Sequence, residues 1–328
     1  MIVHNWIEVI QTANLSAEKD MDVVSRWLII TRAAVFSMTL TSGLIGGLLA
    51  ASAGHVDWTP FLLALLGLVL AHAANNMIND YFDLSGGVDT TEYVRAQYAP
   101  HPILSGLVSK GGLVAAILLV NAIDTAIAGY LVSVRGWTVM VFAALGLFIS
   151  VFYVAPPVRL KHIGLGELGV FLVWGPLMIG GTYYVAAGSL PLWVFAASVP
   201  YALLVTTVLV GKHIDKLEAD GARGIRTLPV LLGRQVSIRL NQALMIAFYA
   251  ITLVLVATHT LGVWVLLIVF SLPRLARVLK TYNEPKPLAP PANYPVWPLW
   301  YVAAAFYLNK LSGGLFILGL VLNLILPS

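Results

Sequence analysis

The chain has 328 residues, of which 59% are hydrophobic and 10% are charged, and its mean hydropathy is +0.87. A soluble domain of this length needs far more charge on its surface, so the composition indicates a polytopic membrane protein. The absence of cysteine excludes disulfides, thiolate catalysis and cysteine-based zinc or iron–sulfur sites.

The N-terminal segment, residues 1–25, carries several acidic residues and no long apolar core. It therefore does not have the pattern of a secretory signal, and we expect a cytoplasmic segment ahead of a single transmembrane domain at 26–328. Within it, "NWIEVIQT" predicts either a short amphipathic helix on the membrane surface or a frayed terminus.

Long apolar stretches follow along the rest of the chain. A spanning helix needs about 20 mostly apolar residues. This rule predicts an all-α fold, a polytopic membrane helical bundle of about nine transmembrane helices. The predicted spans lie near residues 28–50, 59–80, 111–133, 137–155, 167–187, 191–211, 237–258, 261–280 and 297–326.

The basic residues indicate the orientation. With the N-terminus taken as cytoplasmic, Lys and Arg fall on one side, except for Arg135 on the other side and Arg32 and Lys310 within or near spans. Cytoplasmic loops carry an excess of Lys and Arg. The net charge of +4 is therefore explained by topology, and it does not indicate nucleic acid as a partner.

The loop after the second predicted span is unusually polar: residues 75–90 read "NNMINDYFDLSGGVDT". If the helix continues to Asp83, then Asn76, Asp80 and Asp83 fall at i, i+4 and i+7 on one face, with Asn79 four residues before Asp83. Carboxylate and amide oxygens are the ligands Mg²⁺ prefers, together with substrate phosphates. The alternative is a polar helix end that meets water, but so dense a cluster favours a functional site.

A second acidic loop, residues 211–233, follows the sixth predicted span on the same side. It mixes acidic and basic residues: Asp215, Glu218 and Asp220 with Lys212, Lys216, Arg223 and Arg226. Such a mixture suits a metal-bound diphosphate, because the cations neutralise charge that the metal leaves. An ordinary solvated loop is the alternative, and the pairing with the first acidic loop favours the site.

A third loop on this side, residues 152–169, reads "FYVAPPVRLKHIGLGELG" and carries Tyr153, Arg159 and Lys161. We interpret Arg159 as a topology anchor. Lys161 is a candidate phosphate contact.

These three loops resemble the UbiA superfamily of membrane prenyltransferases. "NDYFDLSGGVDT" is similar to the first Asp-rich motif of that family, and "DKLEADGARGIRTLPVLLG" is similar to the second. "FYVAPPVRLKHIGLGELGVFLVWGPLMIGGTYYV" resembles the branch that prenylates 1,4-dihydroxy-2-naphthoate in menaquinone synthesis. The resemblance covers the first seven predicted spans and implies a helical bundle around a central cavity.

The resemblance implies an enzyme that moves a polyprenyl group from its diphosphate onto an aromatic acceptor through a Mg²⁺-assisted allylic carbocation. It implies metal binding and catalysis by the acidic motifs, with Asn76, Asp80, Asp83, Asp215 and Asp220 as the metal-binding residues. It implies substrate contacts from Arg32, Asn79, Asp89, Tyr153, Lys161, Lys212, Glu218 and Arg226. The candidates for aromatic faces near the cation are Tyr153, Trp174, Tyr183 and Tyr184, although for each one singly a packing or membrane-interface role is favoured.

Three features depart from the family pattern. Asp215 and Asp220 are five residues apart, where a spacing of four is common, and a helix places such residues on different faces. His101 in "HPILSG" stands where many relatives have arginine. The C-terminal "YPVWPLWYVAAAFYLNKLSGG" does not resemble the naphthoate branch. The acceptor is therefore open.

Other functions fit the sequence less well. A CDP-alcohol phosphotransferase needs a different spacing after Asp-Gly and further aspartates, and no Asp follows Asp220. A transporter is expected to place its acids near the bilayer midplane in broken helices. A prenyltransferase with an acceptor outside the quinones and a non-catalytic relative both stay open.

Overall fold

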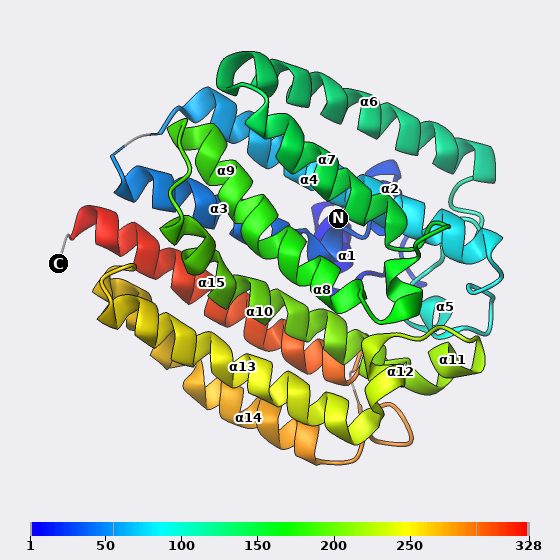
Figure 1. The fold of residues 1–328 in the computed structure, drawn as a ribbon. Helices are drawn as coiled ribbons and strands as arrows, with labels where there is room; N and C mark the ends of the chain where they lie inside the picture. The colour runs from blue at the N-terminus through cyan, green and yellow to red at the C-terminus, as the bar shows by residue number, and fades with distance from the viewer. Residues whose placement is uncertain (1, 55, 293, 327–328) are drawn as a thin grey trace.

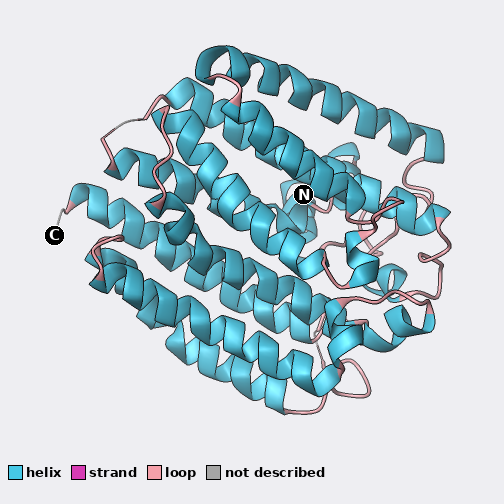
Figure 2. Cartoon of the chain, viewed as in Figure 1, coloured by secondary structure: helices cyan, strands magenta, loops and turns pink. Residues whose placement is uncertain are grey.

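The computed structural model describes residues 2–54, 56–292 and 294–326, and within these ranges it contains helices and loops and no strand (Figure 2). Seven helical stretches are long and apolar enough to cross a membrane: Ala33–Ser52, Trp58–Ser85, Lys110–Arg135, Gly166–Ala187, Trp193–Asp215, Arg234–Ala257 and Tyr301–Ile325. The all-α membrane bundle predicted from composition is confirmed.

The elements follow one another in the order shown in Figure 1. They are α1 (Ile2–Thr12), α2 (Val23–Ile30), η1 (Ala33–Val35), α3 (Phe36–Ser52), α4 (Trp58–Ser85), α5 (Val94–Tyr98), α6 (Lys110–Arg135), α7 (Thr138–Phe152), η2 (Leu160–Ile163), α8 (Gly166–Leu172), η3 (Val173–Leu177), α9 (Met178–Ala187), α10 (Trp193–Asp215), α11 (Leu217–Ala222), α12 (Leu228–Leu232), α13 (Arg234–Ala257), η4 (Val263–Ser271), α14 (Leu272–Asn283) and α15 (Tyr301–Ile325).

Two predicted spans take a different form from the others. The span expected at 137–155 is the apolar helix α7, which has only 15 residues. The span expected at 261–280 is a 3₁₀ segment, η4, followed by α14, whose polar face carries basic residues. In the described part of the chain, seven of the nine predicted spans therefore have the length and hydropathy expected of a membrane helix, and the count of nine is not confirmed.

The helices enclose a cavity of about 850 Å³. It is lined by residues of α3, α4, α6 and α7, of the α8–η3–α9 stretch, and of α10 and α15. The outer helices α13 and α14 lie beside α10 and α15 at the edge of the bundle (Figure 1). The volume is typical of a site for a small molecule, and its walls are mainly apolar.

The helices that form this wall approach one another closely, and small residues at their contacts allow that approach. At Gly46 in α3, a Cβ atom would lie 2.5 Å from the carbonyl oxygen of Ile179 in α9. At Gly319 in α15, it would lie 2.5 Å from the carbonyl oxygen of Trp264. Glycine is favoured at such interfaces because any side chain forces the helices apart.

The polar end of the bundle gathers the short helices. α5, α11 and α12 lie together at one end, where α4 and α10 also end (Figure 1). The predicted amphipathic helix at the N-terminus is present as α1, which packs on α2 and buries Val9 against Ile29. Residues Gln11 to Ala13, at and just beyond its C-terminal end, reach the cavity.

Candidate active site

The first acidic loop forms its stripe as the helical spacing predicts, because α4 continues to Ser85. Asn76, Asp80 and Asp83 are buried on this helix. The amide of Asn76 donates to the carbonyl oxygen of Thr31 at 2.9 Å, which ties α4 to the segment before η1. Asn79 is half-buried and lines the cavity.

Arg32 reaches Asp80 because the helix is interrupted between α2 and η1. Its backbone is left-handed, with φ of +55°, a region that non-glycine residues rarely adopt. The guanidinium donates to Oδ1 of Asp80, and Nε of Arg95 lies 3.5 Å from the same oxygen. The structure thus brings both Arg32 and Arg95 to Asp80, while the substrate contact that the family resemblance implies for Arg32 stays a prediction.

A second left-handed residue, Arg159 with φ of +49°, stands before η2. This turn carries Lys161 inward, where its Nζ lies 2.7 Å from Oδ2 of Asp83, and both side chains are buried. Arg159 itself is exposed. Backbone strain of this kind tends to persist where the surroundings fix it, often at functional sites.

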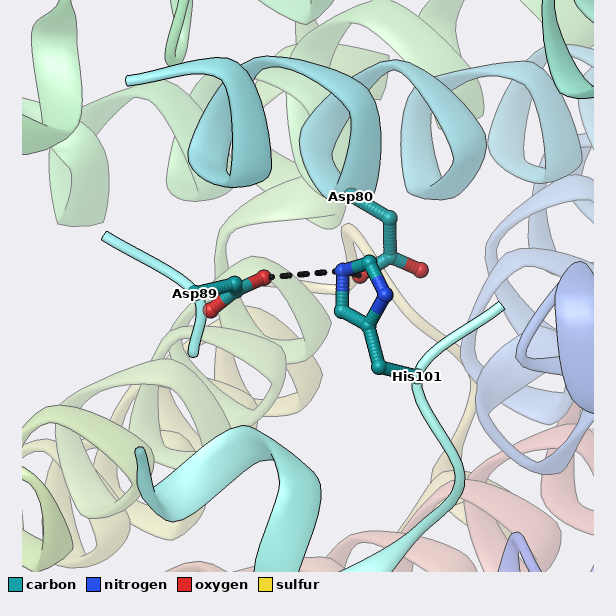
Figure 3. A group of neighbouring side chains, drawn as sticks. All are labelled: Asp80, Asp89 and His101. Carbon is teal, nitrogen blue, oxygen red and sulfur yellow. Dashed lines mark ion pairs between the residues drawn. The ribbon is translucent and has the colours of Figure 1, made fainter. Parts of the chain in front are cut away.

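Asp89, from the loop after α4, joins the cluster through His101 (Figure 3). Nε2 of His101 lies 3.4 Å from Oδ2 of Asp89 and 3.9 Å from Oδ1 of Asp80. Burial raises the pKa of Asp89. The hydrogen bond of the His101 side chain and the nearby cations, Arg32 first, lower the pKa by more than burial raises it, so the pKa lies below its usual value. Asp89 is therefore ionised at neutral pH.

The backbone decides which role His101 can take. Its Nδ1 accepts from the N–H groups of Ile103 and Leu104, each at 3.3 Å. A neutral imidazole with Nδ1 as acceptor carries its proton on Nε2. His101 therefore faces the two carboxylates as a donor, and although Asp80, Asp89 and His101 lie within metal-binding range of one another, only the two carboxylates are free to act as ligands.

Asp220 is the buried acid of the second loop. Its Oδ1 accepts from the hydroxyl of Tyr93, and Nζ of Lys216 lies 3.5 Å away. Burial raises the pKa of Asp220, but Lys216, His213 and the Tyr93 hydrogen bond together hold it below its usual value. Lys216 and Arg223 also lie over the ring of Tyr93, at 4.5 and 4.4 Å from its centre.

Three of the buried carboxylates each have one oxygen without a hydrogen-bond partner among the described residues. Oδ2 of Asp80, Asp89 and Asp220 is buried with no hydrogen-bond partner among the described residues. Buried polar atoms are almost always paired, so each such oxygen needs a ligand. Among the described residues, Asp80 and Asp89 lie within metal-binding range of each other beside Arg32, whereas Asp220 lies beside Lys216. Free carboxylate oxygens beside cations suit hard divalent cations such as Mg²⁺ with a phosphate-bearing partner.

Asp215 has other partners than the predicted metal. Its Oδ2 accepts from the backbone N–H groups of Trp300 and Val302 at 2.9 and 3.0 Å, and Nζ of Lys286 lies 3.4 Å from Oδ1. Oδ2 is therefore bound at the start of α15, and Oδ1 is paired with a lysine of the loop before α15. The wider spacing between Asp215 and Asp220 corresponds to this division, since a new helix, α11, begins after Lys216.

The remaining predicted residues divide between cavity and surface. Lys212 and Tyr153 line the cavity. Glu218 is exposed and forms a pair with Arg234, with oxygen distances of 2.6 and 2.7 Å to its Nη2. Arg226 is also exposed. The structure therefore does not bring Glu218 or Arg226 into the buried cluster.

Of the aromatic residues, Trp174 lines the cavity, whereas Tyr183 is packed in the core. Tyr184 donates to the carbonyl oxygen of Arg135, at the opposite end of α6 from the cluster.

Sequence reasoning missed Arg95, Tyr93 and the role of Lys216. A run of "TEYVRAQY" after an acidic helix end carried the signal for the first two.

The sequence matches the family described as the UbiA prenyltransferase family over residues 39–299. The chain belongs to the UbiA prenyltransferase family. It is therefore a prenyltransferase by family, and its buried acidic cluster and apolar cavity lie within or beside the matched segment.

Individual relatives support the same branch of the UbiA family as the sequence suggested. The chain is 28% identical to the 2-carboxy-1,4-naphthoquinone phytyltransferase of Synechocystis, over 76% of this chain and 78% of the relative. It is 24% identical to the 1,4-dihydroxy-2-naphthoate octaprenyltransferase of Bacillus subtilis, over 78% and 81%.

Solved UbiA structures share the fold. A UbiA homolog from Aeropyrum pernix K1 in its apo form superposes with a TM-score of 0.62 at 19% identity, covering 88% of this chain and 98% of that one. A UbiA homolog from Archaeoglobus fulgidus bound to GPP and Mg²⁺ gives 0.56 at 14% identity, covering 90% and 99%.

Proposed function

We propose that this protein transfers a polyprenyl group from its diphosphate onto an aromatic acceptor, 1,4-dihydroxy-2-naphthoate or a close analogue, in lipoquinone biosynthesis. One observation carries the proposal: buried, unpaired carboxylate oxygens and cations stand beside the polar end of an apolar cavity. A polyprenyl diphosphate has the matching form, with an anionic head and an apolar tail. The relatives named above act on naphthoquinone-type acceptors.

The residues of the cluster divide the work on the donor. Asp80, Asp83, Asp89 and Asp220 would hold Mg²⁺, and the bound ion would supply positive charge that neutralises the diphosphate as a leaving group. Arg32, Lys161 and Lys212 contact the phosphate oxygens and stabilise the negative charge that develops as the allylic C–O bond ionises. Arg95 and His101 keep Asp80 and Asp89 in place.

The cavity protects the cation once it forms. Its mainly apolar wall excludes water, which would otherwise capture the carbocation before the acceptor does. Trp174 and Tyr153 line this wall and present aromatic faces that attract a cation. The electron-rich carbon of the acceptor attacks the cation, and the ring then loses a proton.

We also propose that the cluster faces the cytoplasm, where the soluble ends of both substrates and Mg²⁺ are available. The excess of Lys and Arg in the loops on that side supports this orientation. Reaction of the protein in sealed vesicles with a membrane-impermeant thiol reagent, after introduction of a single cysteine at Arg226, identifies the exposed side.

The function is tested by product analysis with the purified, reconstituted protein. Labelled geranylgeranyl diphosphate is supplied with 1,4-dihydroxy-2-naphthoate, 4-hydroxybenzoate or homogentisate, with and without Mg²⁺. We expect a Mg²⁺-dependent prenylated naphthoate that Asp83→Ala abolishes. A product from another acceptor alone would replace the naphthoate assignment, and no product from any acceptor despite Mg²⁺-dependent donor binding would contradict this acceptor class.

A further inference from the structure

A buried histidine in the membrane part of α4 opens onto the cavity. His72 is 5% exposed and lies on the side of α4 that carries Asn76 and Asp83. Eleven residues separate His72 from Asp83, so the two differ by about 20° around the helix and about 16 Å along it. A polar stripe thus runs from the acidic cluster into the cavity wall, and His72 is its deep end.

Two neighbours fix the ring of His72. Its Nδ1 lies 2.7 Å from Oγ1 of Thr39, and Nε1 of Trp174 donates to the same oxygen at 3.2 Å. The rings of Phe36 and Trp174 pack against it, at 5.3 and 5.1 Å between centres. Trp174 belongs to η3, a π-helical turn that contains Pro176, and such turns often occur at functional sites.

The hydrogen bonds favour one position for the proton of His72, because they give the hydroxyl proton of Thr39 an acceptor. An indole N–H only donates, so Thr39 must accept from Trp174. The single hydroxyl proton of Thr39 then has Nδ1 of His72 as its recorded acceptor among the described residues. A neutral ring with Nδ1 as acceptor carries its proton on Nε2, so Nε2–H is a donor.

Among the residues that the structure describes, this donor has no partner. No hydrogen bond of Nε2 is recorded among the described residues, and the atom is not one of the enclosed unpaired atoms. His72 lines the cavity, so Nε2–H is reached from there. A core histidine held only for packing would have both nitrogens satisfied or enclosed, because an unpaired buried polar group is costly.

We propose that Nε2–H of His72 binds a ring hydroxyl oxygen of the aromatic acceptor, and that Thr39 and Trp174 position His72 for this contact. The inference rests on the proposed function and deepens it, because it assigns the acceptor to the α3–α4–η3 wall. His72 acts as a specificity-determining residue: a ring without an oxygen at that position leaves Nε2–H unpaired. The donor diphosphate, bound at the acidic cluster, does not depend on it.

The test compares three ligands on four variants of the full-length protein. The ligands are 1,4-dihydroxy-2-naphthoate, 1-hydroxy-2-naphthoate and 4-hydroxy-2-naphthoate, and their dissociation constants are measured by calorimetry. The variants are His72→Phe, His72→Gln, Thr39→Val and Thr206→Val. Thr206 is the matched control, because the one partner recorded for its buried hydroxyl among the described residues is the carbonyl oxygen of Ala202 in its own helix.

We expect His72→Phe to raise the dissociation constant of 1,4-dihydroxy-2-naphthoate about 3- to 10-fold, which is the effect of one neutral hydrogen bond. The KM of the prenyl diphosphate donor should stay unchanged. His72→Gln keeps a donor and retains most of the affinity, Thr39→Val shows a smaller loss, and Thr206→Val shows none. One monohydroxy ligand, which lacks the bound oxygen, should not respond to His72→Phe.

An equal loss for all three ligands, or no loss for any, overturns the inference. If His72→Phe fails to fold, the Thr39→Val and Thr206→Val pair decides, since a selective loss in the first supports the contact and equal behaviour contradicts it. Failure of the proposed function is distinct, because the unmodified protein would then bind no geranylgeranyl diphosphate with Mg²⁺.

Discussion

Lys161 and Asp83 form a buried pair whose structural and chemical roles can be separated. Removal of one partner leaves the other charge buried and unpaired, which typically costs about 3–5 kcal/mol. We expect Lys161→Met to lower thermal stability in detergent and to weaken donor binding. The double variant Lys161→Met/Asp83→Asn should recover stability, because no lone charge remains, while transfer stays lost. Recovery of transfer in the double variant would show that the pair is structural only.

Asp215 and Asp220 provide a second comparison at the scale of single residues. Asp215 binds two backbone N–H groups and approaches Lys286, whereas Asp220 has one free oxygen. We expect Asp220→Asn to abolish Mg²⁺-dependent donor binding. Asp215→Asn should lower the free energy of unfolding by about 1–3 kcal/mol, which is measured as a lower unfolding temperature. A loss of Mg²⁺ binding as large in Asp215→Asn as in Asp220→Asn would restore Asp215 to the metal site predicted from the sequence.

At the scale of elements, the approach of α3 to α9 depends on Gly46. A Cβ atom there would meet a carbonyl oxygen and the side chain of Thr182 at 2.9 Å, and neither can move without a shift of α9. We expect Gly46→Ala to destabilise the protein by about 1–3 kcal/mol. Gly314→Ala is the matched control, because a Cβ atom there meets nothing within 4 Å. Equal unfolding temperatures of the two variants would contradict tight packing at this interface.

The helix α1 is held by a contact that pH can release. The hydrogen bonds of Lys19 and Ser16 lower the pKa of Glu8 to about 2, from 4.5. A group whose pKa is lower in the folded state stabilises it above the unfolded pKa and loses that effect as pH falls through the folded value. We therefore expect α1 to stay docked between pH 5 and 8 and to loosen between about pH 4.5 and 2.

Hydrogen exchange of residues 2–22 measures this docking. Glu8→Gln should raise exchange in that segment at pH 7 and remove the extra exchange that acid produces. Because the C-terminal end of α1 reaches the cavity through Gln11 to Ala13, the same variant should also weaken retention of a long-chain donor. Acid-dependent exchange that persists in Glu8→Gln would assign the effect to another group.

At the scale of the whole molecule, local patterns predict what is local. Hydropathy found the positions of the membrane helices, because a span needs a fixed length of apolar residues. Helical spacing placed Asn76, Asp80 and Asp83 on one face of α4, since the helix continues regularly to Ser85. The same rules cannot show that Val263–Ser271 winds as a 3₁₀ segment, because the composition of a spanning helix fits either form.

The partners of the site residues depend on contacts distant in sequence. Asp215 is bound by Trp300 and Val302, which are reached only after α13, η4 and α14 have folded back on α10. Arg32 contacts Asp80 because its own backbone is left-handed, and arginine at this position does not predict that conformation. The acidic residues of a site can thus be listed from the sequence, whereas which of them has a free oxygen is a property of the assembled bundle.

The central claim is that the buried cluster at the polar end of the cavity binds a diphosphate through Mg²⁺. Calorimetric titration of geranylgeranyl diphosphate into the purified protein, with Mg²⁺ or with EDTA, tests it most directly, beside Asp80→Asn and the surface variant Glu218→Gln. The account predicts tight binding that requires Mg²⁺, is lost in Asp80→Asn and is unchanged in Glu218→Gln. Binding that is equally strong in EDTA, or that survives Asp80→Asn, would contradict it.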